Sequence, residues 1–335
     1  MRDEPSLLFV IPDTSAFQSG GNIYNANLVE ALKRIGILIT QQTIEQFAAC
    51  TTTEVFDAII WDSLYLQDAL LGKALRRSPT FLLVHHLESL HPPEGWNSTA
   101  YFLEKEYAQL TRFTGFVVNS PFMQTHLSTH FPNKRYALIP PALGITPHKK
   151  QKSTDHIRAL IIGNLIERKG ILPFLKLLEK YPIPKLLLRL IGSTAHEPSY
   201  AKACLASIKK LPQVTYMGEL SHTQISTQYN WANLLLSCSA METFGMAMQE
   251  AVAFGIPILA LDRGNASAHV QQGHTGWLSP TIESLVAQLQ QLHTQPQLHA
   301  TFLEGALQQK KWETYSWADA AAALVEAIIP KPLNP

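Results

Sequence analysis

Short apolar runs alternate with helical stretches along almost the whole chain, and this alternation restarts once near the middle. In the first half, the apolar runs Ser6–Ile11, Ala58–Trp61 and Phe81–Val84 are separated by segments with helical spacing. Strands that are apolar throughout are typical of parallel sheets that helices cover on both faces. The pattern therefore predicts an α/β fold with two Rossmann-like, doubly wound parallel-sheet domains.

The break between the two halves is a stretch rich in proline and glycine, Pro140–Pro147, followed by the polar run His148–Asp155. A length of 335 residues suits about two domains of roughly 150 residues each. We expect an N-terminal domain over residues 1–147 and a C-terminal donor domain over residues 156–316. Two such domains would face each other across a cleft.

The charge balance excludes one class of partner. Lys and Arg number 27 and Asp and Glu number 26, for a net charge of +1. Non-specific nucleic-acid binding needs a basic surface, so we expect no nucleic-acid partner. The three cysteines are too far apart in the sequence to suggest a zinc site or a disulfide framework.

The N-terminal segment and the apolar runs bear on location. The only apolar run near the start is Leu7–Ile11, and no run reaches the ~18 residues of a membrane span. We therefore expect a cytoplasmic protein. The basic stretch Leu70–Arg77 suggests at most a peripheral contact with the inner face of the membrane, and a solvated helix face is the alternative.

Residues directly after strands are the candidates for a binding site, because open parallel sheets bind ligands beyond the carboxyl ends of their strands. Gly20 and Gly21 follow the first strand and open a helix, where glycine lets a phosphate or sugar approach the backbone. A plain turn is the alternative. No G-x-G-x-x-G is present, which disfavours a nicotinamide oxidoreductase.

Arg168 and Lys169 follow the first strand of the second half, just before a helix expected over residues 171–180. Cations at a helix N-terminus oppose the helix dipole, so an anion bound beside them would explain their position. A diphosphate would satisfy both cations and the free amides. A solvated pair of surface cations is the alternative.

Glu242 and Glu250 are separated by seven residues, with a change from loop to helix between them. Gly245 permits a close backbone approach, and Glu250 is expected about two turns along, on the same face as Glu242. A carboxylate among apolar neighbours needs hydrogen-bond donors, which sugar hydroxyls supply. A helix cap at Glu242 with a surface Glu250 is the alternative.

In this order, the motifs resemble those of the retaining glycosyltransferases of family 4, which have the two-domain GT-B architecture. Glu242 and Glu250 look like the E-x7-E donor motif of that family. Arg168 and Lys169 match its cationic pair, and Gly20–Gly21 matches its N-terminal glycine loop. The resemblance covers nearly the whole chain.

Two further segments, Asp262–Asn265 and Gly273–Leu278, resemble a later loop and turn of the family. The resemblance also implies that the last helix, residues 317–330, packs back onto the N-terminal domain. Two departures stand out: Thr243 replaces a common glycine, which would narrow the sugar pocket, and Asn164 replaces a common arginine.

The resemblance implies a role for each matching residue. Glu250 would hold the ribose hydroxyls, and Glu242 would bind the donor sugar as a catalytic group. Arg168 and Lys169 would stabilise the leaving diphosphate, a role that also follows from the charge that develops there. Further donor contacts would come from the backbone at Phe244, Gly245, Met246 and Ala247.

His85 is the remaining catalytic candidate, because the family often carries a histidine at this strand end, near the acceptor and the donor sugar. We favour His85 over its neighbour His86. A packed or solvated histidine is the alternative, and no metal is expected, because adjacent side chains on a strand point apart and no D-x-D occurs. Glu104 and Glu106 are expected to be surface charges.

The sequence therefore predicts a retaining, metal-independent hexosyltransferase without a cofactor. It would move a hexosyl group from a nucleoside-diphosphate sugar to a hydroxyl acceptor, which is a glycan, a lipid-linked molecule or a small molecule. A sugar-nucleotide epimerase or phosphorylase of the same fold is one alternative. A non-catalytic subunit that binds a sugar nucleotide is another, and the departures at Thr243 and Asn164 keep it open.

Overall fold

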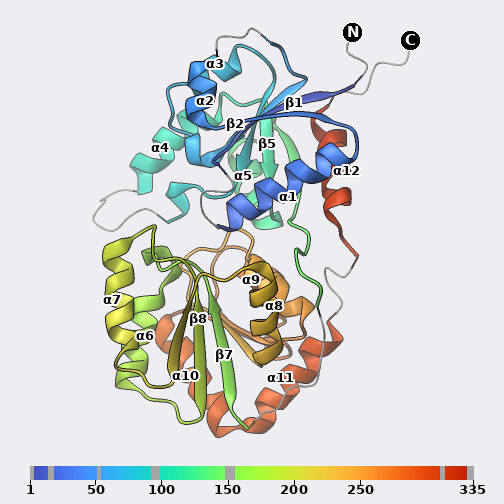
Figure 1. Cartoon of the computed structure of the whole chain (residues 1–335). Coiled ribbons are helices and arrows are strands. Elements are labelled where there is room, and N and C mark those ends of the chain that lie inside the picture. The colour runs from blue at the N-terminus through green and yellow to red at the C-terminus, as the bar shows by residue number, and fades with distance from the viewer. Residues whose placement is uncertain are drawn as a thin grey trace. The chain divides into compact units, whose positions relative to one another are not determined.

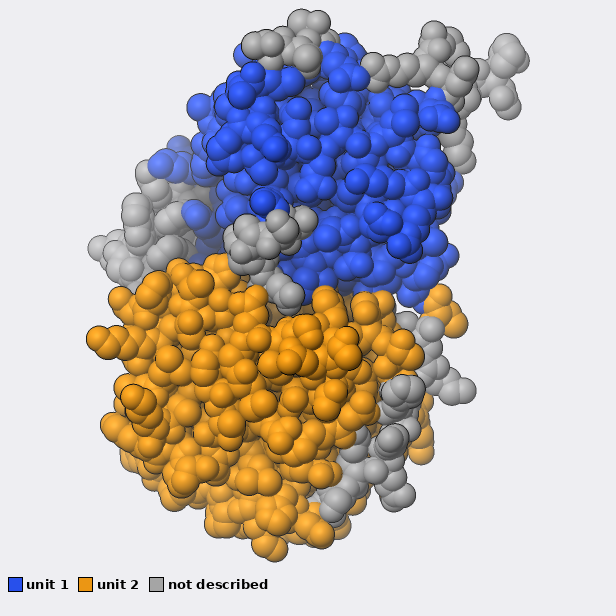
Figure 2. Space-filling view, in the orientation of Figure 1, with its two compact units in different colours: residues 1–142, 315–335 blue, residues 143–314 orange. Residues whose placement is uncertain are grey.

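The computed structural model describes residues 4–13, 19–50, 54–91, 99–147, 155–309 and 314–329. The chain divides into two compact units (Figure 1). Figure 2 shows unit 1, residues 1–142 and 315–335, in blue and unit 2, residues 143–314, in orange. Each unit contains one six-stranded parallel sheet flanked by helices, so the prediction of two doubly wound α/β domains is confirmed.

The sheet of unit 1 is buried on both faces. In spatial order its strands are β2 (Leu38–Gln42), β1 (Ser6–Val10), β3 (Ala58–Asp62), β4 (Thr80–Val84), β5 (Gly115–Val118) and β6 (Arg135–Leu138). Every residue of β1, β3 and β4 is buried. Burial on both faces explains why these strands are apolar except at one terminal residue, instead of alternating.

The helices of unit 1 form one layer on each face of this sheet. They are α1 (Gly20–Arg34), α2 (Ile44–Ala49), α3 (Leu71–Leu75), α4 (Thr99–Leu110), α5 (Pro121–His130) and α12 (Trp317–Ile328). On one face α12 packs against α1 and β6, with Leu28 and Leu324 in a common core (Figure 1). On the other face Leu71 and Leu127 join a second core with residues of α2 and α4.

The sheet of unit 2 has the strand order of a Rossmann domain. In spatial order its strands are β12 (Gly276–Ser279), β11 (Ile258–Leu261), β10 (Leu234–Ser237), β7 (Ile157–Ile162), β8 (Leu186–Ile191) and β9 (Val214–Gly218). All neighbouring strands are parallel. Two strands therefore lie on the far side of β7 and two on the far side of β10.

Unit 2 also has a helix layer on each face. Its helices are α6 (Ile171–Lys180), α7 (Pro198–Ile208), α8 (His222–Trp231), α9 (Met246–Ala253), α10 (Ile282–Thr294) and α11 (Pro296–Gln308). Phe174 of α6 and Leu289 of α10 belong to the core on one face. Tyr229 of α8 and Val252 of α9 belong to the core on the other. None of the described helices has the length and apolar character needed to cross a membrane.

The unit boundaries differ slightly from those expected from the sequence. Unit 1 ends at Ala142, before the expected end at 147, and the chain returns to it at Tyr315. Leu143–Pro147 belongs to unit 2, where Ile145 packs on the core beside α9. Of the polar run His148–Asp155, which we expected to be part of the linker, all residues but Asp155 lie outside the described residues.

Glu106 corrects one prediction. Its residue is only 2% exposed, whereas Glu104 on the same helix is exposed. The carboxylate of Glu106 accepts a hydrogen bond from the backbone N–H of Ser89 at 3.2 Å, and burial raises its pKa. Glu106 therefore holds the short turn Glu88–Leu90 that follows β4 and is not a surface charge.

Candidate active site

Each sheet has one place where the strand order reverses, and the candidate residues follow the strands there. In unit 2 the reversal lies between β7 and β10, and in unit 1 it lies between β1 and β3. Ligands of open parallel sheets bind beyond the carboxyl ends of the strands at this point.

In unit 2, Lys169 and Glu242 form an ion pair. Lys169 follows β7 and Glu242 follows β10, and Lys169 Nζ lies 2.5 Å from Glu242 Oε1. Their side chains are 20% and 14% exposed, so water screens the pair only weakly. The anion that the sequence argument required beside Lys169 is, in this structure, the Glu242 carboxylate.

Arg168 belongs to the short turn Glu167–Lys169, which is fastened to the loop after β10. Its Nη1 donates to the carbonyl oxygen of Met241 at 2.9 Å. Gly170 ends the turn with a φ of 62°, and a Cβ there would lie only 2.2 Å from the carbonyl oxygen of Cys238. This close approach holds both cations beside the loop that carries Glu242.

The loop after β11 also binds the segment that carries Glu242. The backbone N–H of Asn265 donates to the Glu242 carbonyl at 2.7 Å, and Asn265 Nδ2 donates to the Phe244 carbonyl at 2.9 Å. His269 Nε2 lies 2.7 Å from that carbonyl, so this nitrogen carries the hydrogen. A Cβ on Gly264 would lie 2.1 Å from the Glu242 carbonyl oxygen. The backbone around Glu242 is thus fixed by three residues of one loop.

Helix α9 begins without a capping side chain. Its N-cap is Gly245, with a φ of 92°, a conformation that residues with a Cβ rarely adopt. The first amides of a helix have no partner within the helix, and here they belong to Met246, Ala247 and Met248. Such a terminus attracts anions and hydrogen-bond acceptors.

Glu250 lies on α9 and bonds to a tyrosine of the neighbouring helix. The hydroxyl of Tyr229 on α8 lies 2.7 Å from Glu250 Oε2 and 3.0 Å from the carbonyl oxygen of Ala247. Glu242, in contrast, lies in the loop before α9. The expected change from loop to helix between the two acids is therefore present, whereas the alternative of a cap at Glu242 is wrong, since Gly245 occupies that position.

The two acids differ in their charge state. Burial raises the pKa of Glu242, but the charge and hydrogen bond of Lys169, a hydrogen bond with Ser239 and the charge of Arg168 outweigh it, so that pKa lies below its usual value. Burial raises the pKa of Glu250 to about 7, although the hydrogen bond from Tyr229 opposes this shift. At neutral pH Glu242 is ionised, and Glu250 is close to its titration midpoint.

Asn164 has a structural contact that a comparison of motifs did not predict. Its Oδ1 accepts a hydrogen bond from the backbone N–H of Ser193 at 3.1 Å, and Leu165 N–H donates to the Ser193 carbonyl at 2.9 Å. Asn164 therefore fastens the loop after β8 to the loop after β7, at a position where the sequence resemblance led us to expect an arginine.

In unit 1, the glycine pair and His85 pack together. Gly20 and Gly21 are the first residues of α1, whose N-cap Ser19 accepts a hydrogen bond from Asn22 N–H at 3.1 Å. A Cβ on Gly21 would lie 3.3 Å from Cγ and Cδ2 of His85. Gly21 thus leaves room for the imidazole of His85, a role that the sequence did not suggest.

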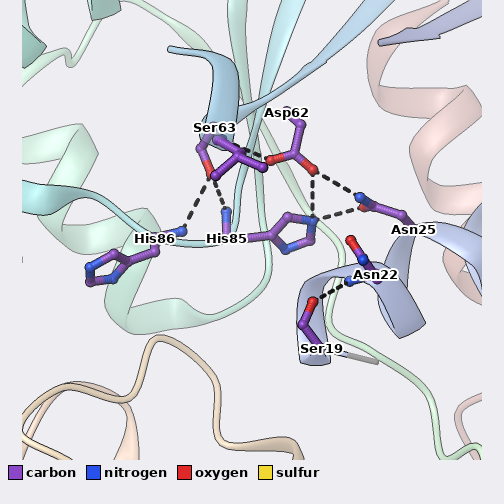
Figure 3. A network of polar contacts seen from close by, with 8 residues as sticks. Ser19, Asn22, Asn25, Asp62, Ser63, His85 and His86 are labelled. Carbon is purple, nitrogen blue, oxygen red and sulfur yellow. Dashed lines mark hydrogen bonds and ion pairs between the residues drawn. The ribbon is translucent and has the colours of Figure 1, made fainter. Parts of the chain in front are cut away.

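The side chain of His85 is held by polar residues from α1 and β3 (Figure 3). His85 Nε2 lies 2.8 Å from Asn25 Oδ1 and 3.6 Å from Asp62 Oδ2. The backbone N–H groups of His85 and His86 point to Ser63 Oγ, at 3.1 and 3.4 Å. Of the two histidines, His85 is the one whose imidazole Asn25 and Asp62 contact.

The structure brings Arg168, Lys169 and Glu242 together in unit 2, and Gly21 and His85 together in unit 1. Glu250 contacts Tyr229 of α8 instead. Asn265 belongs to the segment Asp262–Asn265 that the sequence singled out, without a contact assigned to it. Four other residues with contacts at these sites were not predicted: Tyr229, His269, Asn25 and Asp62. Two of them had a signal in the sequence. Asp62 ends an apolar strand, and Asn25 interrupts the apolar stripe of a helix, so each is a buried polar residue that needs a partner.

Two other predictions concern metals and membranes. Among the residues that the structure describes, no three or more His, Cys, Asp and Glu side chains form a group that could hold a metal ion. In the basic stretch 70–77, Lys73 Nζ donates to the carbonyls of Phe47 and Cys50, and Arg77 donates to that of Glu54. Two of its three cations therefore hold the preceding segment of unit 1.

Comparison with known proteins identifies the family of unit 2. Residues 145–309, about half of the chain, match the family model described as glycosyl transferases group 1. Unit 2 is thus a group 1 glycosyl transferase domain. Membership of family 4 and the E-x7-E assignment stay predictions.

Among curated proteins, the chain is 22% identical over 190 residues to the alpha-monoglucosyldiacylglycerol synthase of Acholeplasma laidlawii, covering 51% of this chain and 47% of that protein. It is 30% identical over 117 residues to a D-inositol 3-phosphate glycosyltransferase of Rhodococcus erythropolis, covering 34% and 26%. The chain therefore matches less than half the length of these relatives.

Solved structures match the whole fold. A sucrose-phosphate synthase of Thermosynechococcus elongatus has a TM-score of 0.79 at 20% identity, covering 96% of this chain and 98% of that one. HepE of Anabaena, solved with UDP and glucose, has a TM-score of 0.68 at 18% identity, covering 97% and 96%. Both comparisons concern the fold, which is the two-domain α/β fold of the GT-B glycosyltransferases.

Proposed function

We propose that the protein is a retaining hexosyltransferase that uses a nucleoside-diphosphate sugar and a hydroxyl acceptor. The observation that carries this proposal is the Lys169–Glu242 pair at the carboxyl ends of β7 and β10, with Arg168 beside it. Two cations and an ionised carboxylate in one place suit a ligand with a diphosphate at one end and hydroxyls at the other.

Within unit 2, the contacts support one set of residues for the diphosphate and another for the sugar. Lys169 uses one of its ammonium hydrogens for Glu242, and the others remain for phosphate oxygens. Arg168 likewise keeps guanidinium hydrogens beyond the one given to Met241. The ionised Glu242 accepts hydrogen bonds from hydroxyls of the sugar, and the open N-terminus of α9 adds backbone amides of Met246 and Ala247.

Glu250 would bind another part of the same donor, its ribose. Its carboxylate lies on α9 and bonds to Tyr229 through one oxygen. A carboxylate has further acceptor sites, which suit the paired hydroxyls of a ribose. Because the pKa of Glu250 is raised to about 7 by burial, this contact strengthens as the group ionises.

These groups suggest how the hexosyl group is transferred. The bond between the anomeric carbon and the phosphate oxygen breaks, and negative charge develops on the diphosphate, where the Arg168 and Lys169 cations stabilise it. The acceptor hydroxyl attacks from the face that the diphosphate leaves, and its proton passes to the leaving phosphate. The new glycosidic bond then has the configuration of the donor. No metal or cofactor takes part in this proposal.

The test is product analysis with a panel of donors and acceptors. A thermal-shift screen against uridine and guanosine diphosphate hexoses first selects the donor, because a bound ligand raises the melting temperature. The selected donor is then incubated with a diacylglycerol, an inositol phosphate and a simple sugar. Proton NMR of the product is expected to show the anomeric configuration of the donor.

The same experiment separates the two alternatives. A sugar-nucleotide epimerase converts the donor without any acceptor, and a phosphorylase needs phosphate. A non-catalytic subunit binds the donor and leaves it unchanged. An inverted product, or binding without turnover for every donor and acceptor in the panel, contradicts the proposal.

A further inference from the structure

The polar network around His85 is almost completely buried. Asn25 is 0% exposed and Asp62 is 3% exposed, and the side chain of His85 is 16% exposed. The three residues come from α1, β3 and the segment after β4, so the fold brings them together from distant parts of the sequence (Figure 3). Buried polar groups of this kind are costly unless their hydrogen bonds are all made.

The hydrogen bonds of the network fix the orientation of the Asn25 amide. Asn25 Nδ2 lies 2.8 Å from Asp62 Oδ2 and must donate to it, because a carboxylate only accepts. Asn25 Oδ1 then faces His85 Nε2, also at 2.8 Å. The other oxygen of Asp62 accepts from the backbone N–H of Leu64 at 2.9 Å, which holds the carboxylate in place.

This orientation decides which nitrogen of His85 carries the hydrogen. An amide oxygen only accepts, so His85 Nε2 must donate, and in a neutral imidazole Nδ1 is then the acceptor. Nδ1 lies on the side of the ring away from Asn25 and Asp62 (Figure 3). The His85 ring also packs on Gly21, and the ring of Tyr24 lies edge-on to it, with 5.3 Å between the ring centroids. The orientation of the His85 ring is therefore fixed from three sides.

The surroundings keep the imidazole neutral. Burial lowers the pKa of His85, and the charge of Asp62 opposes the shift without reversing it. Tyr24 donates its hydroxyl to the carbonyl oxygen of Ile139 at 2.8 Å, and burial raises its pKa well above the usual value, so this neighbour is also neutral. A neutral ring with a fixed hydrogen is a hydrogen-bond acceptor at Nδ1.

We infer that Asn25 and Asp62 are positioning residues that hold His85 with its hydrogen on Nε2 and present Nδ1 as an acceptor to a substrate hydroxyl. The kinetic part of this inference rests on the proposed function, whereas the tautomer of His85 does not. The hydroxyl belongs either to the donor sugar or to the acceptor, and the two sources are separated by the reaction that is measured.

The direct test is NMR of the full chain labelled with 15N in its histidine rings, with the His85 signals assigned from the His85→Gln variant. At pH 7.5 the wild type is expected to show His85 as the Nε2–H tautomer. Asn25→Leu and Asp62→Asn are expected to shift the signals towards the other tautomer. A wild-type His85 that is protonated, or hydrogenated on Nδ1, overturns the inference.

Kinetics of the same variants complete the test. Asn25→Leu and Asp62→Asn are expected to lower kcat by about 10-fold or more, with a smaller change in the KM of the donor. Asn25→Asp is expected to restore part of the loss, because a protonated carboxyl donates to Asp62 and accepts from His85 as the amide does. Asn27→Ala is the matched control, since Asn27 lies on the same helix and bonds to Ile23 of that helix.

The source of the hydroxyl follows from two assays. If donor hydrolysis without acceptor falls as much as transfer, the hydroxyl belongs to the donor sugar; if only transfer falls, it belongs to the acceptor. Unchanged kcat in Asn25→Leu with a changed tautomer overturns the positioning role. A wild type that shows the Nε2–H tautomer but no transfer contradicts the proposed function and leaves the assignment of the tautomer intact.

Discussion

The two units carry polar clusters of different kinds at the carboxyl ends of their sheets. In unit 2 the cluster is charged, with Lys169 bound to an ionised Glu242 and Arg168 close by. In unit 1 it is built around a neutral imidazole, His85, that Asn25 and Asp62 orient. The first suits a ligand with formal charge, and the second suits a hydroxyl.

Under the proposed function, the two clusters would bind different parts of the substrates. Both sheets are parallel and both clusters follow strands beside the point where the strand order reverses. The side chains nevertheless differ in charge between the two clusters. We therefore expect substitutions in unit 2 and in unit 1 to affect different steps of the proposed reaction.

Removing either member of the Lys169–Glu242 pair should have the largest effect. Lys169→Ala and Glu242→Ala are each expected to lower transfer by roughly 100- to 1,000-fold, because fixed charges at the leaving group are lost. Steady-state kinetics with the selected donor measures this. Lys176→Ala is the control, since Lys176 forms an exposed ion pair with Glu179 on the same unit. Full turnover in either site variant shows that the site is assigned wrongly.

Displacing the backbone of Glu242 should have the next largest effect. Gly264→Ala places a Cβ 2.1 Å from the Glu242 carbonyl oxygen, so the loop must move and donor affinity should fall by about 10-fold or more. Gly273→Ala is the matched control: its φ of 75° is similar, but nothing lies within 4 Å of the added Cβ. Equal losses of affinity in both variants imply that backbone strain alone explains the effect.

Glu250 provides a prediction about pH. Its pKa is raised to about 7 in the folded protein. Between the usual carboxyl pKa and pH 7, the folded protein therefore keeps a proton on Glu250, whereas the unfolded chain has lost it. Stability from this group is therefore lost as pH rises through that interval, by about 3 kcal/mol. In denaturant titrations from pH 4.5 to 8, Glu250→Gln should become more stable relative to wild type as pH rises. A constant difference contradicts the raised pKa.

Gly21→Ala should have a moderate effect that is confined to unit 1. The added Cβ would lie 3.3 Å from the His85 ring, which must move by a few tenths of an ångström. We expect kcat to fall about 3-fold to 10-fold while the donor-induced rise in melting temperature stays unchanged. A loss of donor affinity in this variant would mean that either the glycine pair or the displaced His85 ring contacts the donor.

Thr243→Gly should have the smallest effect. Thr243 lies between Glu242 and the buried Phe244, at a position where the sequence resemblance led us to expect glycine. Removing its side chain should widen the sugar pocket and change the ratio of kcat/KM values between two hexose donors by about 10-fold or less. Competition between two donors measures this ratio, and an unchanged ratio shows that Thr243 does not line the pocket.

Much of the fold follows from apolar periodicity. The helix expected over residues 171–180 coincides with α6, because its apolar residues recur with helical spacing. Helix α8, in contrast, was missed, since His222–Trp231 has few apolar residues and is recognised only by its capping box at Ser221. Glu106 was misjudged because a charged residue is normally exposed, and only the packed turn after β4 explains its burial.

The candidate site was only partly predictable for a related reason. Lys169 and Glu242 belong to short motifs whose order along the chain is itself informative. The contact between Asn25 and Asp62 depends on which face of α1 meets the end of β3, and no local pattern encodes that. The pKa of Glu250 likewise depends on burial beside Tyr229, a residue of another helix.

The central claim is that unit 2 binds a nucleoside-diphosphate hexose through Lys169 and Glu242. Isothermal titration of the wild type and of Lys169→Ala with the donor selected by thermal shift tests it most directly. We expect saturable binding with one site per chain in the wild type and at least ~10-fold weaker binding in the variant, because a cation at the diphosphate is lost. Equal affinity in the two proteins, or no binding of any such donor to the wild type, contradicts the claim.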